Sequence, residues 1–568
     1  MLPTKSTRST SLVLAFGLAV AALSIAAPAT ARELIAVPGA AIADDIAPGS
    51  TIAVSPDPDY PPSDSRYHSY PEILAELDDI AAAHPAIVRV MSLGTTSQGR
   101  DIPLVKITDS PGTDEHEPEV LFDSTTHARE HLTPEMALSI IHLLVDGYGT
   151  SGYARTTAIV DSRVTWVIPV LNPDGLSWDL GRDPYRGWRK NRQTNGPGHQ
   201  KGTDINRNYG WHWGGPGSSG DTDSETYRGP GAFSTQEAAA VRDFVQGRAI
   251  DGRQRISTHI SFHANGELIL IPYGYTRADV TPDITTLDQR TFVSMAQAMA
   301  DTNGYTPKQE SDLYVHSGTM VDWMYARQRI FSFTFELYPT DPQPDTAGKF
   351  YPPDELIEAE TIRNHDAVLY LLEQADCPYR AIGKANAYCG PWYDDLEIGR
   401  GWIFDPNGTD TASEGAWQRG DPDGTTAYST KQPGTAWSGR SALVTGLAAG
   451  GCADCNDVDG GITTVRSRTI TLPASGPLTL RLRYFLGHKG NASVGDGLRI
   501  AVITGGVRTI VLDIPAIPGT NRRASWTAIS TDLSAWSGKT VAIQFETTDA
   551  GGPSLIEAGV DDLRITSH

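Results

Sequence analysis

The chain has 568 residues, of which 39% are hydrophobic, and its 46 basic and 68 acidic side chains give a net charge of −22. This length predicts at least two domains, each large enough to bury a core of its own. The net negative charge and the lack of a polybasic segment argue against binding to nucleic acid or to an anionic membrane surface. Four cysteines are too few for a disulfide-dense scaffold.

The N-terminal segment has the three parts of a secretory signal peptide. Lys5 and Arg8 precede the uncharged apolar run 11–27, and Ala29-Thr30-Ala31 forms a small-x-small cleavage site. The run is shorter than the roughly 20 residues that a membrane span needs. We therefore expect residues 1–31 to be removed and the protein to be secreted, extracellular or periplasmic, without membrane attachment.

The next two regions differ in composition. Residues 32–65 are rich in Ala, Pro, Asp and Ser, which predicts an extended leader or short pro-segment without a core. Over residues 66–376, amphipathic helical stretches alternate with short apolar strands, which predicts an α/β domain with a mixed, mainly parallel sheet and helices on both faces. The predicted strands are 120–124, 164–171, 256–262, 268–273 and 330–337.

Local signals also mark helix starts and a turn in this region. Pro71 is placed to open a helix, Thr133 is a candidate N-cap, and Ser234 with Glu237 forms a candidate capping box. Asn172-Pro173-Asp174-Gly175 predicts a turn that ends the strand before it.

The pattern changes after residue 376. The Gly/Pro/Asp-rich segment 377–400 predicts a linker, and in 401–568 apolar residues such as Leu478, Leu480 and Leu482 alternate with polar ones. Period-two strands separated by turn residues predict an antiparallel β-sandwich or jelly roll.

The four cysteines fall at this boundary and beyond it. Cys377 and Cys389 flank the boundary and are expected to pair with each other. Cys452 and Cys455 form C-x-x-C, but the βαβ context of a thioredoxin-like redox site is missing, so a small loop-closing disulfide is expected instead. Zinc at the cysteines is the weakest alternative in an exported protein.

Four side chains with catalytic chemistry follow predicted strands of the α/β domain. His127 and Glu130 lie three residues apart between a strand and a helix, and His263 and Glu336 stand at the ends of two further strands. Crevices of open α/β sheets form at the carboxyl edge of the strands, so these side chains are expected to converge there. Two imidazoles and one carboxylate suit Zn²⁺ with a fourth position left open. The alternatives are a solvated helix face for the first pair, a structural histidine and a structural carboxylate.

Residues 67–376 resemble the zinc carboxypeptidases of the carboxypeptidase A/B type, including the secreted bacterial ones. The motifs that carry the resemblance occur in order: HARE (127–130), WRKNR (188–192), DINRNY (204–209), ETYRGPGAFS (225–234), SFH (261–263), PYGY (272–275), YVHSG (314–318) and FTFEL (333–337). The resemblance implies a metallocarboxypeptidase that acts on the C-termini of peptides and proteins, with one Zn²⁺ held by His127, Glu130 and His263.

The resemblance also implies roles for the remaining motif residues. Glu336 is implied to be the general base, and Arg189 the arginine that stabilises the oxyanion. The substrate carboxylate is implied to bind Asn206 and Arg207, since a guanidinium offers a bidentate fork. Tyr314 and Arg129 are implied to complete the substrate-binding site.

Specificity is implied by a single position. Val321 lies where the family places the base of the specificity pocket, and its apolar side chain favours hydrophobic or aromatic C-terminal residues. Asp322 beside it leaves two interpretations open, a structural carboxylate or an acid that admits basic residues as well. Two departures from the family pattern are Ala264-Asn265 after His263 and the short leader, which has no room for a large folded pro-domain.

The C-terminal region loosely resembles the β-sandwich domains appended to secreted bacterial hydrolases. Its acidic loops make Ca²⁺ binding an alternative to simple solvation, at Asp454, Asn456, Asp457 and Asp459 or at Asp561 and Asp562. We expect a monomer. Two alternatives to an ordinary carboxypeptidase are the same site acting on cell-wall peptides or as a deacylase, and a catalytically silent peptide-binding protein.

Overall fold

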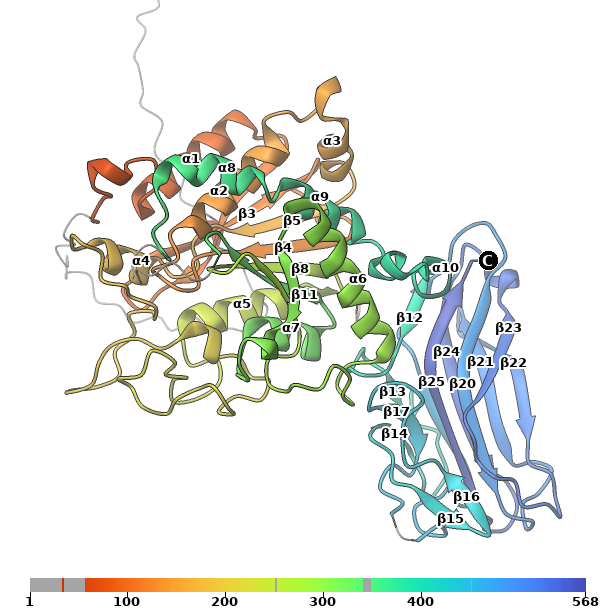
Figure 1. Ribbon diagram of the computed structural model, residues 1–568. Coiled ribbons are helices and arrows are strands. Elements are labelled where there is room, and N and C mark those ends of the chain that lie inside the picture. The colour runs from red at the N-terminus through yellow and green to blue at the C-terminus, as the bar shows by residue number, and fades with distance from the viewer. Residues whose placement is uncertain (1–32, 35–56, 251–252, 341–348, 451, 568) are drawn as a thin grey trace, which may run out of the picture.

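The computed structural model of the protein describes residues 33–34, 57–250, 253–340, 349–450 and 452–567. The predicted signal peptide 1–31 lies outside the described residues. Figure 1 shows two bodies of different architecture, one built from helices around a central sheet and one built from long strands.

The first body contains a nine-stranded sheet in the order β1-β2-β3-β5-β4-β8-β11-β9-β10. Five neighbouring pairs are parallel and three are antiparallel, so the prediction of a mixed, mainly parallel sheet is confirmed. The strands are β1 (Glu33–Leu34), β2 (Val88–Thr95), β3 (Asp101–Ile107), β4 (Glu119–Asp123), β5 (Val164–Ile168), β8 (Ile256–Ala264), β9 (Leu268–Ile271), β10 (Thr306–Gln309) and β11 (Phe331–Leu337).

Helices cover both faces of this sheet, as predicted. Successive strand residues point to opposite faces of the sheet. In β4, Val120 and Phe122 belong to the core on one face, which is covered by α1, α2, α3, α6 and α9. Leu121 between them belongs to the core on the other face, which is covered by α5 and α7. The α-helices are α1 (Tyr70–Ala83), α2 (Leu132–Val145), α3 (Ala154–Val160), α4 (Pro173–Leu180), α5 (Gln236–Gly247), α6 (Thr286–Asn303), α7 (Met320–Gln328), α8 (Ile357–Ile362), α9 (His365–Gln374) and α10 (Ala385–Tyr388).

Short 3₁₀ helices and two small hairpins complete the elements. The 3₁₀ helices are η1 (Pro62–Asp64), η2 (Ser151–Tyr153), η3 (Ile205–Arg207), η4 (Glu310–Asp312), η5 (Asp354–Leu356), η6 (Pro378–Ile382) and η7 (Ser534–Trp536). The hairpins pair β6 (Ala249–Ile250) with β7 (Arg253–Gln254) and β15 (Thr425–Ala427) with β16 (Ser429–Gln432).

Three predicted boundaries are corrected by the structure. The helix expected to be capped by Thr133 already begins at Leu132. α5 is capped by Thr235, whose hydroxyl accepts from the Ala238 N–H, because the Ser234 hydroxyl accepts from the Asn208 side chain instead. The predicted turn at 172–175 is the start of α4, where Asn172 is the N-cap and accepts from the Gly175 N–H.

The described end of the predicted leader packs on the first body. Tyr60 is buried in the core, and its ring lies 5.2 Å from that of His131. The Arg100 Nε donates to the Asp57 carboxylate over 3.1 Å. The expectation of a segment without a core is therefore wrong for residues 57–65, because their aromatic and acidic side chains find partners on the first body.

The second body is a sandwich of two antiparallel sheets, which confirms the predicted all-β fold. One sheet has the order β14-β17-β25-β20-β23 with β12 also paired to β25, and the other has the order β13-β18-β24-β21-β22 with β19 paired to β24. The strands are β12 (Trp392–Asp394), β13 (Ile403–Phe404), β14 (Trp417–Gly420), β17 (Ala442–Thr445), β18 (Gly461–Arg466), β19 (Ile470–Thr471), β20 (Thr479–His488), β21 (Gly497–Thr504), β22 (Val507–Pro515), β23 (Thr527–Asp532), β24 (Thr540–Asp549) and β25 (Ile556–Thr566).

The segment 377–400 connects the two bodies through ordered structure. It contains η6, α10 and β12, and β12 belongs to a sheet of the sandwich. Disulfides join Cys377 to Cys389 and Cys452 to Cys455, as expected from the sequence. In Figure 1, α10 and β12 lie between the two bodies.

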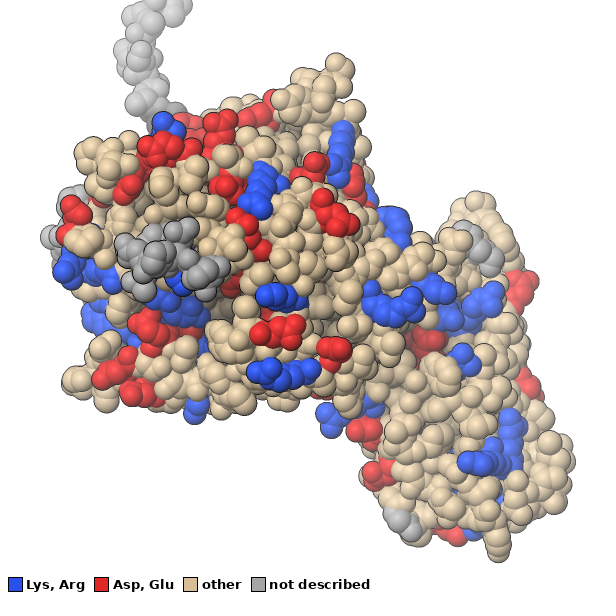
Figure 2. All heavy atoms as spheres, in the orientation of Figure 1, with Lys and Arg blue, Asp and Glu red and all other residues tan. Residues whose placement is uncertain are grey.

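Charged side chains lie on the visible surface of both bodies. Figure 2 shows acidic and basic side chains interspersed over the visible face of the first body and fewer charges on the sandwich. None of the helices formed by the described residues combines the length and the hydropathy that a membrane span requires.

Candidate metal and active site

Three neighbouring parallel strands bring the predicted metal ligands together. β4, β8 and β11 are adjacent in the sheet and run in the same direction. His127 and Glu130 lie in the loop between β4 and α2, and His263 is the last residue but one of β8. Carboxyl ends of parallel strands meet at one edge of the sheet, so these side chains share a crevice.

The ligand atoms of these three residues converge. The Nδ1 atoms of His127 and His263 lie 3.0 Å apart, and the Glu130 carboxylate lies 2.8 Å from the first and 2.9 Å from the second. All three side chains are buried, and their candidate ligand atoms lie within 4.8 Å of one another. Two imidazole nitrogens that face each other at this distance are well suited to share one cation.

The charges of the cluster also fit a cation. Burial alone would raise the pKa of Glu130, but His127 and His263 hold it below its ordinary value. Burial likewise opposes protonation of His263, yet the Glu130 carboxylate raises the pKa of that ring to about 9. The Glu130 carboxylate therefore favours a positive charge at the point where the three side chains meet. Two nitrogens and one carboxylate oxygen form the donor set of a catalytic zinc site.

Asp204 supports this cluster, although sequence reasoning did not single it out. One carboxylate oxygen lies 3.2 Å from the His127 Nε2, and the other accepts from the Arg189 Nε over 3.0 Å. The carboxylate is fully buried, and its contact with the outer nitrogen of a ligating histidine is typical of metal sites. Its only sequence signal is its place at the start of the DINRNY motif.

Glu336 lies on the strand next to His263. In the parallel pairing of β11 with β8, Glu336 stands in register with His263. Burial raises the pKa of the Glu336 carboxyl group to about 8, with a further rise from Glu130 and an opposing effect of His263. A carboxyl group with this pKa beside a metal site is suited to accept and return a proton near neutral pH.

The two predicted arginines lie close to the metal-ligand cluster. Arg189 contacts Asp204, and the charges of Asp204 and Glu130 raise its pKa against the effect of burial. Arg129 donates to the Gly187 carbonyl over 3.2 Å, and its guanidinium lies 4.3 Å from the centre of the Phe350 ring.

The predicted substrate-binding residues form a second cluster beside the metal ligands. The Asn206 amide nitrogen lies 3.4 Å from the His263 Nε2, and its oxygen accepts from the Met320 N–H over 2.9 Å. Arg207 is buried and donates through Nη2 to the Tyr314 hydroxyl over 2.7 Å. Tyr314 is 47% exposed, so it forms the outer wall of this cluster.

Val321 is buried in the first turn of α7, directly after the segment that carries Tyr314. The structure thus brings His127, Glu130, His263, Glu336, Arg189, Asn206, Arg207 and Tyr314 into one connected region. Glu310 and His316 lie beside Tyr314 and Arg207 in this region, and sequence reasoning did not select them as site residues.

The structure does not support the calcium prediction in the β-sandwich. The Asp454 carboxylate pairs with Lys489, the Asp561 carboxylate accepts from the Trp437 and Ser438 N–H groups, and Asp562 pairs with Arg564. Among the described residues of the sandwich, no three His, Cys, Asp or Glu side chains come within reach of a common ion. These acids are used by donors of the protein itself.

Comparison with known proteins places the site in a family context. The sequence pattern of the zinc carboxypeptidase family matches residues 73–366. A zinc carboxypeptidase from Saccharothrix mutabilis subsp. capreolus is 42% identical over 326 residues, which cover 57% of this chain and 73% of that protein. Carboxypeptidase A2 from Rattus norvegicus is 32% identical over 279 residues, which cover 48% of this chain and 63% of that protein.

Solved structures give matches over a similar share of the chain. Thrombin activatable fibrinolysis inhibitor aligns with 55% of this chain and 76% of its own, with 26% identity and a TM-score of 0.49. Carboxypeptidase A from Helicoverpa armigera aligns with 54% of this chain and 73% of its own, with 28% identity and a TM-score of 0.47. The family match ends before the β-sandwich begins.

Proposed function

The chain belongs to the zinc carboxypeptidase family and is a metallocarboxypeptidase, and from this premise we propose that the site described above removes the last residue of peptides and proteins. His127, Glu130 and His263 would hold one zinc ion, a role supported by their converging ligand atoms. When bound, the ion supplies a Lewis acid that polarises the scissile carbonyl group and lowers the pKa of a water molecule.

Glu336 and Arg189 carry the chemistry that belongs to the protein. Glu336 takes a proton from the attacking water and delivers it to the leaving amine, which its raised pKa and its register with His263 support. Arg189, fixed by Asp204, directs its positive charge at the oxygen on which negative charge develops. A fixed charge of this kind contributes roughly 3 kcal/mol to the transition state.

Arg207 is the observation that carries the exopeptidase assignment. It is a buried guanidinium held beside the metal ligands by Asn206 and Tyr314. A buried cation of this kind needs an anionic partner, and only the end of a peptide brings a carboxylate to that depth. Tyr314, half exposed, would close over the bound residue, and Arg129 would hold the preceding part of the substrate.

The finer assignments are part of the same proposal. The apolar Val321 at the specificity position supports a preference for hydrophobic C-terminal residues. The signal-like N-terminus and the two disulfides support secretion. We further propose that residues 66–376 form the catalytic domain, that 401–568 form an accessory domain, and that the protein acts as a monomer.

A peptide panel tests the activity. Peptides that end in Phe, Leu, Arg or Glu are incubated with the zinc-loaded protein, and release of the last amino acid is measured with and without a chelator. We expect release that the chelator abolishes, and a fall in kcat of at least about 1,000-fold in Glu336→Gln with KM nearly unchanged.

Matched substrates and a control variant sharpen this test. A peptide with an amidated C-terminus should be cleaved far more slowly, since it offers Arg207 no carboxylate. Glu355→Gln, an exposed acid outside the site, should behave like the wild type. Failure to release any residue from the panel would refute the proposed function, and release of the amidated residue at an equal rate would refute the role of Arg207.

A further inference from the structure

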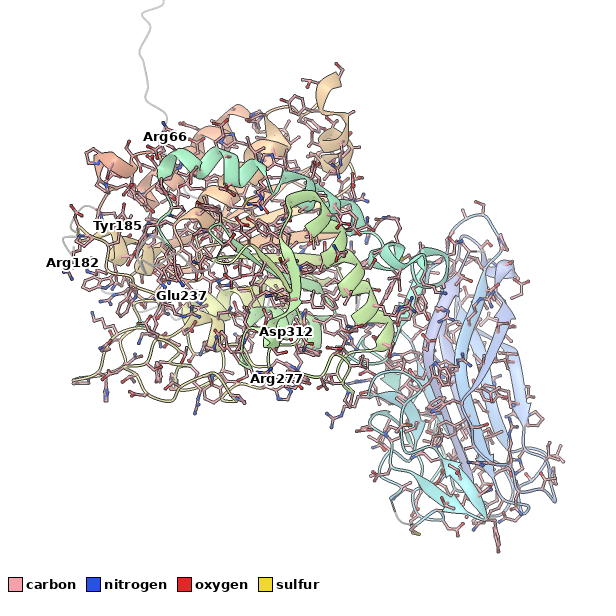
Figure 3. The ribbon with its side chains drawn as sticks, viewed as in Figure 1. Arg66, Arg182, Tyr185, Glu237, Arg277 and Asp312 are labelled. Carbon is pink, nitrogen blue, oxygen red and sulfur yellow. A yellow bond between two sulfur atoms is a disulfide. The ribbon has the colours of Figure 1, made fainter. Side chains whose placement is uncertain are left out.

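Three buried titratable side chains lie behind the Arg207–Tyr314 contact. They are Glu310 of η4, His316 of the following loop and Asp322 of α7, with exposed fractions of 2%, 6% and 0%. Figure 3 labels Asp312, which closes the same short helix η4 and is exposed. Buried acids are costly unless each is paired or serves a ligand.

Asp322 has protein partners for its carboxylate. The Gly274 N–H lies 3.0 Å from one of its oxygens and 3.2 Å from the other. Its own N–H donates to the Thr319 hydroxyl at the start of α7. Of the two interpretations that the sequence left open, the structure therefore favours a structural carboxylate that fixes the backbone at Gly274.

Glu310 differs from Asp322 because one of its oxygens is left over. Its Oε1 accepts from the Thr334 hydroxyl over 2.8 Å. Its Oε2 has no hydrogen-bond partner among the described residues. The His316 Nε2 lies 3.4 Å from Oε2, where a protonated ring would form an ion pair with it but no hydrogen bond. A fully buried carboxylate oxygen without a donor is rare, and it points to a ligand that supplies one.

This oxygen lies in the substrate site rather than in a separate cavity. Thr334, which holds Glu310, stands two residues before Glu336 on β11, so both side chains project from the same face of the sheet. His316 lies against Tyr314, with the ring centres 4.7 Å apart and its Nδ1 2.7 Å from the Tyr314 carbonyl oxygen. The Glu310 carboxylate therefore sits between the proposed base and the proposed carboxylate clamp.

A glycine packs directly against this oxygen. A Cβ atom on Gly274 would stand 2.9 Å from the Glu310 Oε2 and 3.0 Å from the His316 Nε2, closer than Cβ atoms ordinarily approach other heavy atoms. The same glycine donates its N–H to Asp322. Any side chain at position 274 would therefore press on the Glu310 carboxylate and on His316, so this position beside the acid requires glycine.

We propose that Glu310 is a specificity-determining residue whose Oε2 receives the cationic side chain of a C-terminal Lys or Arg, so that the site accepts these residues in addition to the hydrophobic ones that Val321 favours. This assignment rests on the proposed function, because it takes the Arg207 cluster as the binding site of the terminal residue. The substrate carboxylate neutralises Arg207. The Glu310 Oε2 beside it then still lacks a hydrogen-bond donor, and the ring of His316 lies next to it. A hydrophobic residue would seal that oxygen from water without a partner, whereas an ammonium or guanidinium group supplies the missing donor.

The proposal predicts that the pocket discriminates by charge. The substrates are three peptides that differ only in the last residue, which is Arg, citrulline or Phe. Citrulline has the shape of Arg without its charge. We expect the wild type to hydrolyse the Arg peptide at least about 10-fold faster, in kcat/KM, than the citrulline peptide. This comparison needs no variant.

Glu310→Gln then tests the residue itself, with Asp312→Asn as a matched loss of one negative charge on the same 3₁₀ helix. We expect Glu310→Gln to lower the Arg-to-Phe ratio of kcat/KM at least about 10-fold and to abolish the preference for Arg over citrulline. Asp312→Asn should leave both ratios unchanged. The proposal is overturned if Glu310→Gln changes the Arg-to-Phe ratio by less than this. It is also overturned if the wild type cleaves the Phe peptide but does not distinguish Arg from citrulline. Either result leaves the proposed carboxypeptidase activity intact. Cleavage of none of the three peptides overturns the proposed function itself.

Discussion

Asp204 illustrates how much of an active site depends on residues that contact neither substrate nor metal. One of its oxygens orients His127, and the other holds Arg189. Burial alone would raise the pKa of the Asp204 carboxyl group. The charges of Arg189 and His127 instead hold that pKa well below its ordinary value. A single ionised side chain therefore fixes both a metal ligand and the group proposed to stabilise the oxyanion.

Replacement of Asp204 by Asn should weaken both functions. Asparagine keeps the shape but removes the charge that orients the two partners, so we expect zinc affinity to fall about 10- to 100-fold and kcat/KM to fall with saturating zinc as well. Competition with a chromogenic chelator measures the first effect, and peptide hydrolysis measures the second. Asp223→Asn, at an exposed position, serves as the control. Zinc affinity equal to that of the wild type would contradict the role assigned to Asp204.

The residues predicted from the sequence and those missed differ in a physical way. His127, Glu130, His263 and Glu336 end or follow apolar strands, so the rule that parallel strands share a carboxyl edge is enough to bring them together. Asp204 and Glu310 lie in loop and 3₁₀ segments, where position depends on hydrogen bonds to distant residues such as Thr334. No periodicity in the sequence encodes those contacts.

At the scale of elements, the five predicted strands correspond to β4, β5, β8, β9 and β11, whereas β1, β2, β3 and β10 are not predicted by the sequence pattern. Strands such as β11 are short apolar runs whose burial fixes them, and the predicted 330–337 differs from the observed element by one residue. The Asn-Pro-Asp-Gly segment that begins α4 contains residues favoured both in turns and at helix N-termini, and tertiary packing decides between the two. The burial of Tyr60 likewise depends on an aromatic cluster formed with distant residues.

Strand β25 carries a buried acid in the sandwich. Glu557 is fully buried, and its two oxygens lie 2.9 and 2.6 Å from the hydroxyl of Thr425. That hydroxyl has one proton, so the second contact is a hydrogen bond only when Glu557 is itself protonated. Burial raises the pKa of Glu557 to about 8, partly opposed by Thr425. The folded protein therefore holds a proton here that the unfolded chain releases above about pH 4.3.

This difference predicts a pH-dependent stability. Because the folded state binds the proton more tightly, the contribution of Glu557 is fully present below about pH 4 and is lost as pH rises towards 8. Glu557→Gln should therefore gain stability relative to the wild type between pH 5 and pH 8, on the order of 3 kcal/mol. Urea denaturation at the two pH values measures the gain. The exposed Glu414→Gln should show no such trend, and an equal pH dependence in Glu557→Gln and wild type would contradict the assignment.

At the scale of the whole molecule, a buried arginine joins the two bodies. Arg329 follows α7, and its guanidinium lies 3.3 Å from the Asp395 carboxylate and 3.6 Å from that of Glu397. Glu397 in turn accepts from the N–H groups of Arg440 and Ser441, directly before strand β17 of the sandwich. The connection is therefore a continuous polar chain through the interface rather than a flexible tether.

Breaking this chain should uncouple the two bodies. Arg329→Met leaves two buried carboxylates without their cation, and a loss of this kind costs about 3 kcal/mol or more. We expect scanning calorimetry to show a lower Tm and the sandwich unfolding before the catalytic body. Adding Glu397→Gln should restore part of the loss, because it removes one of the unpaired charges.

Arg440 offers a matched control for this prediction. It also reaches across the interface, with its guanidinium 3.9 Å from the Asp283 carboxylate, but its side chain is 58% exposed. Exposed ion pairs contribute about 0–1 kcal/mol, so Arg440→Met should change the Tm little. If Arg329→Met unfolds at the wild-type temperature, or if both arginine variants lose the same stability, burial of the Arg329 charge does not hold the two bodies together.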